Sequence, residues 1–286
     1  EGIQAASSTC CLRGHDGVFF QAGVDTGMGM INLQYETSTV EGRFRHLSLP
    51  RAEFLRFNSS VLGLGDISRE GKHFDVIAAF FDLEGFTAFC NQIDPQLVIP
   101  EYLDQMLNWL FFRLSGSFVK EQAEDHVVLW GKLPFFAKFL GDGILLLWDT
   151  QGLGQASMGN IIVNLYRVCR SYPTEFLPEI QKKLNKVPYR LRCGIARGEV
   201  VAIGGGRDFV GSCVNMASRL QKVSKLSFVF ARKGFNADEC FSATWQEQFT
   251  AKRFHVRGLD QEELIFVSRS EFDSLPEEEK RLFQEP

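Results

Sequence analysis

A near-continuous apolar run at residues 76–81 constrains the fold more than any other feature of this 286-residue chain. Valine, isoleucine, alanine and phenylalanine fill the run, which ends at Asp82. A strand without polar positions is covered on both faces, so the run predicts a central strand of a sheet with helices packed against it. A second apolar stretch, residues 135–148, is broken by Gly141-Asp142-Gly143. The break predicts a hairpin between two further strands.

Asp82 and Asp142 are the first candidate functional residues. Each stands where an apolar run stops, so the two carboxylates converge if the strands are neighbours. Paired carboxylates suit Mg²⁺ or Mn²⁺, because these ions are held by one or two carboxylates together with substrate phosphate oxygens. Each residue also has a structural interpretation, since Asp-Gly is a common turn signal and an aspartate before a helix is a common cap.

A third segment, residues 191–220, adds polar groups in a regular arrangement. Arg192 lies inside a predicted strand, where a single charge requires an anionic partner. Asn215 and Arg219 are four residues apart and therefore lie on one face of a predicted helix. Their structural interpretation is that Asn215 caps the helix and Arg219 is solvated.

Four motifs in these segments resemble, in the same order, those of the catalytic domain of class III nucleotidyl cyclases, the adenylyl and guanylyl cyclases. They read F-F-D-L-E-G-F-T at residues 80–87, K-F-L-G-D at 138–142, R-C-G-I-A-R-G-E-V at 192–200 and V-N-M-A-S-R at 214–219. The resemblance covers residues 74–268. It implies an α/β (α+β) fold with a ferredoxin-like βαββαβ core and a C-terminal extension.

The resemblance also implies a reaction and its metal site. The ribose 3′-hydroxyl of a nucleoside triphosphate would attack the α-phosphorus, and pyrophosphate would leave, giving a 3′,5′-cyclic nucleotide. Two Mg²⁺ or Mn²⁺ ions would be held by Asp82, Asp142 and the carbonyl of Leu83. The backbone N–H groups of Gly85, Phe86 and Thr87 would hold phosphate oxygens.

The remaining substrate contacts follow from the same resemblance. Asn215 would orient the ribose, and Arg219 would stabilise the transition state. Arg192 and Arg257 would bind the triphosphate, and Lys138 and Asp208 would read the base. A lysine and an aspartate at the last two positions are typical of adenylyl cyclases, which favours ATP. Because the metal and base groups come from different protomers in the family, we expect a homodimer.

Sequence features bear on three alternative functions of this chain. The long separation between Asp82 and Asp142, an extra segment at residues 122–134 and the bulky Phe139 and Trp148 fit a pyrimidine cyclase, which makes cyclic UMP or cyclic CMP in bacterial anti-phage defence. A catalytically inactive cyclase-like domain typically lacks a metal aspartate or the Asn/Arg pair, whereas this chain has Asp82, Asp142, Asn215 and Arg219. A diguanylate-type enzyme would carry G-G-(D/E)-E-F, which the chain lacks.

Composition narrows the class of protein further. The net charge is −4 and no basic run is present, so there is no electrostatic signature of nucleic-acid binding. No apolar stretch is long enough to span a bilayer, and residues 1–14 do not have the pattern of a signal peptide. The odd number of cysteines favours free thiols in a reducing cytoplasm; they are Cys10, Cys11, Cys90, Cys169, Cys193, Cys213 and Cys240.

The hydrophobic pattern predicts the domain organisation and the other elements. Residues 1–73 form an extension of unknown role, with strand candidates at 17–20 and 30–33 and a short helix at 51–62. Residues 74–270 form the catalytic domain, and 271–286 form a charged tail, read as a solvated helix. Within the catalytic domain we expect a long helix after Pro100, helices at 161–169 and 176–184, and strands at 191–195, 228–231, 254–256 and 264–267.

Overall fold

The computed structural model describes residues 36–40, 44–258 and 262–286. The chain divides into two compact units, Glu1–Gly65 and Asp66–Pro286. The strand candidates at 17–20 and 30–33 lie outside the described residues.

The described part of the first unit contains a hairpin and two short helices. Strand β1 (Glu36–Val40) pairs antiparallel with β2 (Phe44–Ser48). The helix predicted at 51–62 is instead two pieces, α1 (Arg51–Arg56) and the 3₁₀-helix η1 (Ser59–Leu62). The interruption has a local cause, because the Asn58 side chain accepts a hydrogen bond of 2.9 Å from the Ser60 N–H and so starts a new turn.

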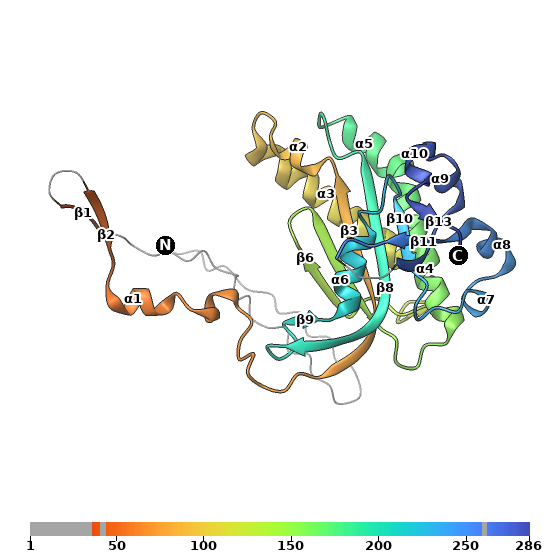
Figure 1. Ribbon diagram of the computed structural model, residues 1–286, viewed down its shortest axis with the longest axis horizontal. Coiled ribbons are helices and arrows are strands. Elements are labelled where there is room, and N and C mark those ends of the chain that lie inside the picture. The colour runs from red at the N-terminus through yellow and green to blue at the C-terminus, as the bar shows by residue number, and fades with distance from the viewer. Residues whose placement is uncertain (1–35, 41–43, 259–261) are drawn as a thin grey trace. The chain divides into compact units, whose positions relative to one another are not determined.

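The second unit is built on one large sheet (Figure 1). Its strands lie in the order β13 (Phe283–Gln284), β11 (Phe249–His255), β12 (Glu262–Ser268), β10 (Phe228–Ala231), β8 (Arg190–Ile203), β3 (His73–Glu84), β7 (Gly143–Asp149) and β6 (Phe136–Phe139). The short strand β9 (Asp208–Val210) pairs with the end of β8. The β8–β10 pair is parallel, and the other pairs of this sheet are antiparallel.

The helices complete the predicted core. Along the chain, β3, α3 (Pro95–Gly116), β6, β7, α4 (Gln155–Ser171) and β8 form a βαββαβ unit whose sheet order is β8-β3-β7-β6. The ferredoxin-like core with a C-terminal extension is therefore confirmed. The other helices are α2 (Phe86–Cys90), the π-helix η2 (Tyr172–Phe176), α5 (Leu177–Gln181), α6 (Ser212–Leu220), α7 (Ala237–Cys240), α8 (Ala243–Gln248), α9 (Arg269–Asp273) and α10 (Glu277–Lys280).

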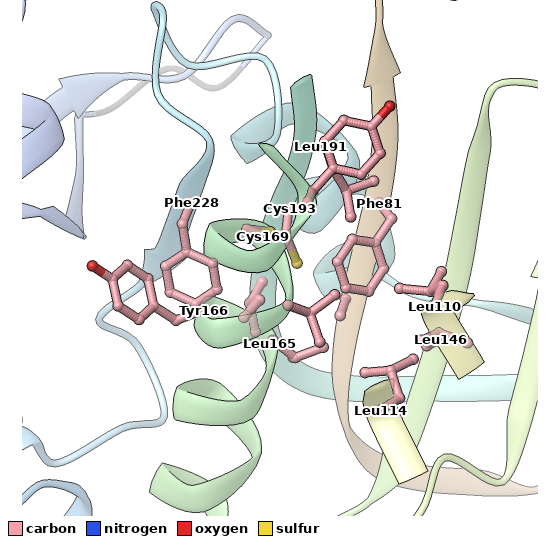
Figure 2. Packing of buried hydrophobic residues seen from close by; sticks show 14 of the residues in the cluster. Phe81, Leu110, Leu114, Leu146, Leu165, Tyr166, Cys169, Leu191, Cys193 and Phe228 are labelled. Carbon is pink, nitrogen blue, oxygen red and sulfur yellow. The ribbon is translucent and has the colours of Figure 1, made fainter. Parts of the chain in front are cut away.

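Two hydrophobic cores lie on opposite faces of this sheet. On the face that we call the α4 face, Ile77, Ala79 and Phe81 of β3 join the α3 and α4 side chains; Figure 2 shows Leu110 and Leu114 of α3 on one side of Phe81 and Leu165 of α4 on the other. On the α6 face, the alternate β3 residues Val76 and Ala78 pack with α6. This double coverage is what the apolar run required.

Several element boundaries differ from the sequence prediction. The long helix begins at Pro95, because proline is well tolerated at a first helical position, and Pro100 lies inside it. Strand β8 continues well beyond the predicted 191–195, and β11 begins before the predicted 254–256 and ends at His255. The prediction missed these parts because polar residues interrupt their apolar runs. The predicted solvated tail is wrong in part, because Leu275 and Phe283 are buried and β13 extends the sheet.

The extra segment at 122–134 contributes to a separate hairpin of β4 (Val119–Gln122) and β5 (Val127–Leu129). Its apolar side chains are largely exposed, with Trp130 at 56%.

Candidate functional site

The two candidate metal-binding aspartates lie on neighbouring strands. Asp82 is opposite Gly143 in the β3–β7 pair, and the N–H of Leu83 donates a 3.1 Å hydrogen bond to the carbonyl of Asp142. Asp82 is only 3% exposed, whereas Asp142 is half-buried in the turn before β7. The two strands are therefore neighbours, which is the condition that the sequence set for these two carboxylates to lie close together.

Arg192 of β8 is the partner of Asp82. The two residues are directly opposite in the β3–β8 pair, and Arg192 donates to Oδ2 of Asp82 from Nε, at 3.1 Å, and from Nη2. The anionic partner that the sequence required for Arg192 is thus the candidate metal ligand itself.

Strand parity places several candidate residues on the α6 face. Side chains alternate across a strand, so Asp82 shares the face of Val76 and Ala78. Lys138 similarly shares the face of Phe136, which packs against the same core. Arg192 lies two residues from Gly194, whose position directly under α6 marks the same face. Asp82, Lys138 and Arg192 therefore lie on one side of the sheet.

Helix α6 is held very close to β8 by that glycine. A Cβ atom at Gly194 would lie 2.2 Å from the carbonyl oxygen of Ala217 and 2.3 Å from the N–H nitrogen of Gln221. Only glycine leaves room for the helix backbone here. The glycine of the R-C-G-I motif thus fixes the height of α6 above the sheet.

Asn215 and Arg219 are both exposed on α6. Arg219 Nη1 donates a 3.4 Å hydrogen bond to the carbonyl of Gly258, the residue after Arg257. Arg257 is exposed in the turn after β11. Arg219, which the resemblance assigned to the transition state, therefore contacts the turn that also contains Arg257, which the resemblance assigned to the triphosphate.

Lys138 and Asp208 form an ion pair with an Nζ–Oδ2 distance of 2.5 Å. They are far apart in sequence and meet because β9 folds back towards β6. The ring of Phe209 on β9 contacts Phe136, with a centroid distance of 4.8 Å, and also contacts Phe74 and Phe135. This aromatic cluster positions Asp208 for Lys138.

The predicted phosphate-binding turn follows β3. Gly85 has φ +94°, and a Cβ there would lie 3.1 Å from the ring of Tyr189, so the turn requires glycine. Gly85 precedes α2; Phe86 is half-buried and Thr87 is exposed. The sequence analysis missed Tyr189, whose pKa is raised chiefly by its hydrogen bond to the Glu84 carboxylate.

Trp148 does not crowd the nucleotide site. It is fully buried, and its Nε1 donates a 3.0 Å hydrogen bond to the carbonyl of Lys132. The interpretation of Trp148 as a pocket residue is therefore wrong, because its apolar position in β7 makes it a core residue. Phe139, by contrast, is 46% exposed on the edge strand β6.

A cavity of about 460 Å³ lies beside α6 and was not foreseen from the sequence. Its walls mix small apolar residues with acidic and basic ones, and Arg219 belongs to them. The lining residues are Ala196, Arg197, Gly198, Glu199, Ser212, Cys213, Met216, Arg219, Ala231, Lys233 and Glu263.

The donor set at Asp82 fits a hard divalent ion that shares its ligands with a substrate. Two carboxylates and a main-chain carbonyl of adjacent strands are oxygen donors of the kind that Mg²⁺ prefers. Within the described part of the chain, no cluster of three or more His, Cys, Asp or Glu side chains forms a complete metal site.

Comparison with known proteins gives a structural likeness only. No family model and no curated protein sequence matches the chain. The adenylyl cyclase CyaB from P. aeruginosa is similar in structure, with a TM-score of 0.52 and 15% sequence identity over 70% of this chain and 96% of that chain. The guanylyl cyclase Cya2 gives 0.43 and 17%, over 70% of this chain and 94% of that chain.

The likeness to CyaB, together with the sheet order, establishes that this chain has the fold of class III nucleotidyl cyclase catalytic domains. In the described residues, no helix has the length and apolar character needed to cross a membrane.

Proposed function

We propose that the chain is a class III nucleotidyl cyclase, which converts a nucleoside triphosphate to a 3′,5′-cyclic nucleotide and pyrophosphate. One observation carries the proposal: Asp82 and Asp142 lie at the same end of the neighbouring strands β3 and β7, and strand parity places Asp82 on the face of the sheet that also carries α6. A carboxylate for divalent ions, Asp82, and a cationic group for a triphosphate, Arg192, then belong to one surface.

The reaction needs no covalent enzyme intermediate. The 3′-oxygen forms a bond to the α-phosphorus, the bond from the α-phosphorus to the bridging oxygen breaks, and the 3′-hydroxyl proton is lost. Catalysis then depends on positioning and on stabilising charge. Asn215 would orient the ribose, Arg219 would stabilise the charge that develops on the phosphorane, and Arg192 and Arg257 would bind the triphosphate.

Asp82, Asp142 and the carbonyl of Leu83 would hold two Mg²⁺ or Mn²⁺ ions. When bound, such ions lower the pKa of the 3′-hydroxyl and neutralise phosphate charge. The turn at Gly85, Phe86 and Thr87 would place backbone N–H groups near the phosphates, with Tyr189 packed against Gly85.

The Lys138–Asp208 pair supports ATP as the substrate. A lysine donor beside a carboxylate acceptor complements a ring nitrogen next to an exocyclic amine, which is the edge that adenine presents. Guanine and uracil present the reverse pattern, and a site built for one pattern rejects the other because buried polar groups would stay unpaired.

CTP is the alternative substrate that this pair favours, because cytosine has the same order of acceptor and amine as adenine on a smaller ring. A pyrimidine cyclase would then make cyclic CMP. UTP, the other pyrimidine substrate, would require Lys138 or Asp208 to act through water or another residue.

We also infer a homodimer with shared active sites. In the described residues, neither Asp82 nor Asp142 has a hydrogen bond or ion pair to α6. A partner chain would bring its own α6, Lys138 and Asp208 to the metal side of this chain, giving two equivalent sites.

Incubation of the pure protein with ATP, CTP, GTP or UTP and Mn²⁺, followed by mass spectrometry of the products, tests the proposal. We expect cyclic AMP as the main product, and dominant cyclic CMP or cyclic UMP would support the pyrimidine alternative. No cyclic product from any of the four, in protein shown to be folded, would favour an inactive nucleotide-binding domain.

A further inference from the structure

Three acidic residues of β3 each pair with an arginine of β8. The distances for the outer two pairs are 2.6 Å from Arg197 to Asp75 and 3.4 Å from Arg190 to Glu84. The third pair, Asp82–Arg192, lies between these two along the strands and is the most buried of the three. The exposed fraction of the side chain is 5% for Asp82 and 16% for Arg192. It is also the one that contains a candidate metal ligand.

In this geometry, Arg192 and a metal ion would compete for the carboxylate of Asp82. Both hydrogen bonds from Arg192 end on the same oxygen, Oδ2 of Asp82. A divalent ion bound to this carboxylate would be a second cation a few ångströms from the guanidinium, and the repulsion is strong in a buried setting. Asp82 therefore cannot bind Arg192 and a metal ion together as strongly as it would bind either one alone.

Removing the arginine without a replacement is also unfavourable. A buried carboxylate that loses its counter-ion keeps the full cost of desolvation. In the chain without metal, Arg192 supplies the positive charge that the fold needs at Asp82.

We propose that Arg192 is a built-in counter-ion that a divalent ion displaces from Asp82, and that the displaced guanidinium then binds the substrate triphosphate. This inference rests on the proposed function. It makes metal and nucleotide binding mutually favourable, because the triphosphate draws Arg192 away from Asp82 and the metal releases Arg192 for the triphosphate. Linkage requires each to strengthen the other by the same factor.

The test measures binding of Mn²⁺ alone to the full chain, by the loss of the electron paramagnetic resonance signal of free Mn²⁺. We expect Arg192→Gln to bind Mn²⁺ about tenfold more tightly than the wild type, because the competing charge is removed. Arg197→Gln is the matched control: it breaks a cross-strand pair of the same two strands without touching Asp82, and its Mn²⁺ affinity should equal that of the wild type.

A nucleotide analogue without the 3′-hydroxyl, 3′-deoxy-ATP, supplies a second readout with the opposite sign. Arg192→Gln should bind this analogue more weakly while it binds Mn²⁺ more tightly. An arginine that only supports the fold would weaken both, and one that only binds phosphate would leave the Mn²⁺ affinity unchanged. Either result overturns the inference.

A measurement on the wild type avoids dependence on a variant that fails to fold. The Nε–H resonance of Arg192, assigned in the wild type by through-bond correlation to its own backbone, should move and exchange faster with solvent when Mg²⁺ is added alone. An unchanged resonance at saturating Mg²⁺ overturns the inference.

Asp82→Asn separates this inference from the proposed function. If the wild type binds Mn²⁺ no better than Asp82→Asn, the metal site itself is wrong and both fail. If binding depends on Asp82 but not on Arg192, the counter-ion role alone fails.

Discussion

At the scale of single residues, Asp82 and Asp142 are unequal members of one candidate site. Asp82 is buried and bound to Arg192, whereas Asp142 lies half-buried in a turn. Both side chains are candidate metal ligands, but they contribute differently to the stability of the fold. Substitutions at the two positions should therefore affect activity alike and stability differently.

Asp142→Asn should lower turnover more than about 100-fold, because it removes a ligand for the ions that stabilise the transition state. It should change the free energy of unfolding by less than about 0.5 kcal/mol, as expected for a turn side chain. Asp82→Asn should lose as much turnover and also destabilise the fold by about 3 kcal/mol, because Arg192 is left without its counter-ion. Product assays at saturating Mn²⁺ and urea unfolding measure both effects.

Asp149→Asn is the control for that comparison, since Asp149 is the last residue of β7, at the opposite end of that strand from Asp142. Its turnover should match the wild type. Retained turnover in Asp142→Asn would contradict the two-metal assignment.

The raised pKa of the Cys213 thiol predicts that the free energy of unfolding depends on pH. Burial on the inner side of α6 raises the pKa of its thiol from 9.0 to about 11. The folded state thus holds the proton more tightly than the unfolded state, so this contribution is complete below pH 9 and is lost as the pH rises towards 11. The loss should reach about 2–3 kcal/mol.

Urea unfolding of the wild type and of Cys213→Ala at several values between pH 8 and 10.5 isolates this effect, because contributions from other groups cancel in the difference. The stability advantage of the wild type over Cys213→Ala should shrink across this range. A constant difference would show that the thiol has the same pKa in both states.

Residue types predicted which groups need partners, but not always which partners they find. Arg192 required an anion, and its opposite neighbour on β3 supplies one. The Lys138–Asp208 contact was assigned only by resemblance, because it depends on how β9 folds back. That path is set by Phe209 packing against phenylalanines more than 60 residues away, and such non-local packing leaves no periodic signal in the sequence.

At the scale of elements, strand β8 organises the candidate site. Its first part carries Arg192, its middle lies under α6, and its end pairs with β9. The sequence predicted only residues 191–195 as a strand, because Arg197, Gly198 and Glu199 interrupt the apolar run. Pairing with β3 along residues 190–201 overrides this local polarity.

Gly194→Ala should displace or destabilise α6. Its new methyl group would lie 2.2 Å from the carbonyl oxygen of Ala217, which neither backbone can relieve without moving. We expect a loss of at least about 2 kcal/mol in the free energy of unfolding and a fall in turnover, since Asn215 and Arg219 move with the helix. Urea unfolding and product assays measure the two effects.

Gly116→Ala provides the comparison, because nothing lies within 4 Å of its Cβ position at the end of α3. Alanine there should be neutral or stabilising by up to about 1 kcal/mol. A Gly194→Ala variant as stable as Gly116→Ala would show that α6 is not held at the height described.

At the scale of the whole molecule, the shared-site dimer is the central prediction. Asp82→Asn and Arg219→Ala should each be inactive alone. An equimolar mixture should recover up to about a quarter of wild-type turnover, because half of the dimers are mixed and each has one intact site. The assay is cyclic-nucleotide production after subunit exchange, followed by light scattering to confirm dimers.

Asn215→Ala mixed with Arg219→Ala is the matched negative control. Both changes lie on α6, so every site in a mixed dimer carries one defective helix and activity should stay absent. Activity in this control, or its absence in the first mixture despite proven exchange, would contradict the shared site.

The separation of the two cores by the sheet has a consequence for amide hydrogen exchange. Both helices pack on the same sheet, but they are buried to different extents. In α6, Asn215 and Arg219 are exposed and only the inner side is buried, whereas most residues of α4 are buried. Local opening should therefore release the α6 amides at lower free energy than those of α4. A nucleotide or a second chain that covers α6 should slow exchange there first, and the extent of slowing would report how much of the catalytic surface each of them orders.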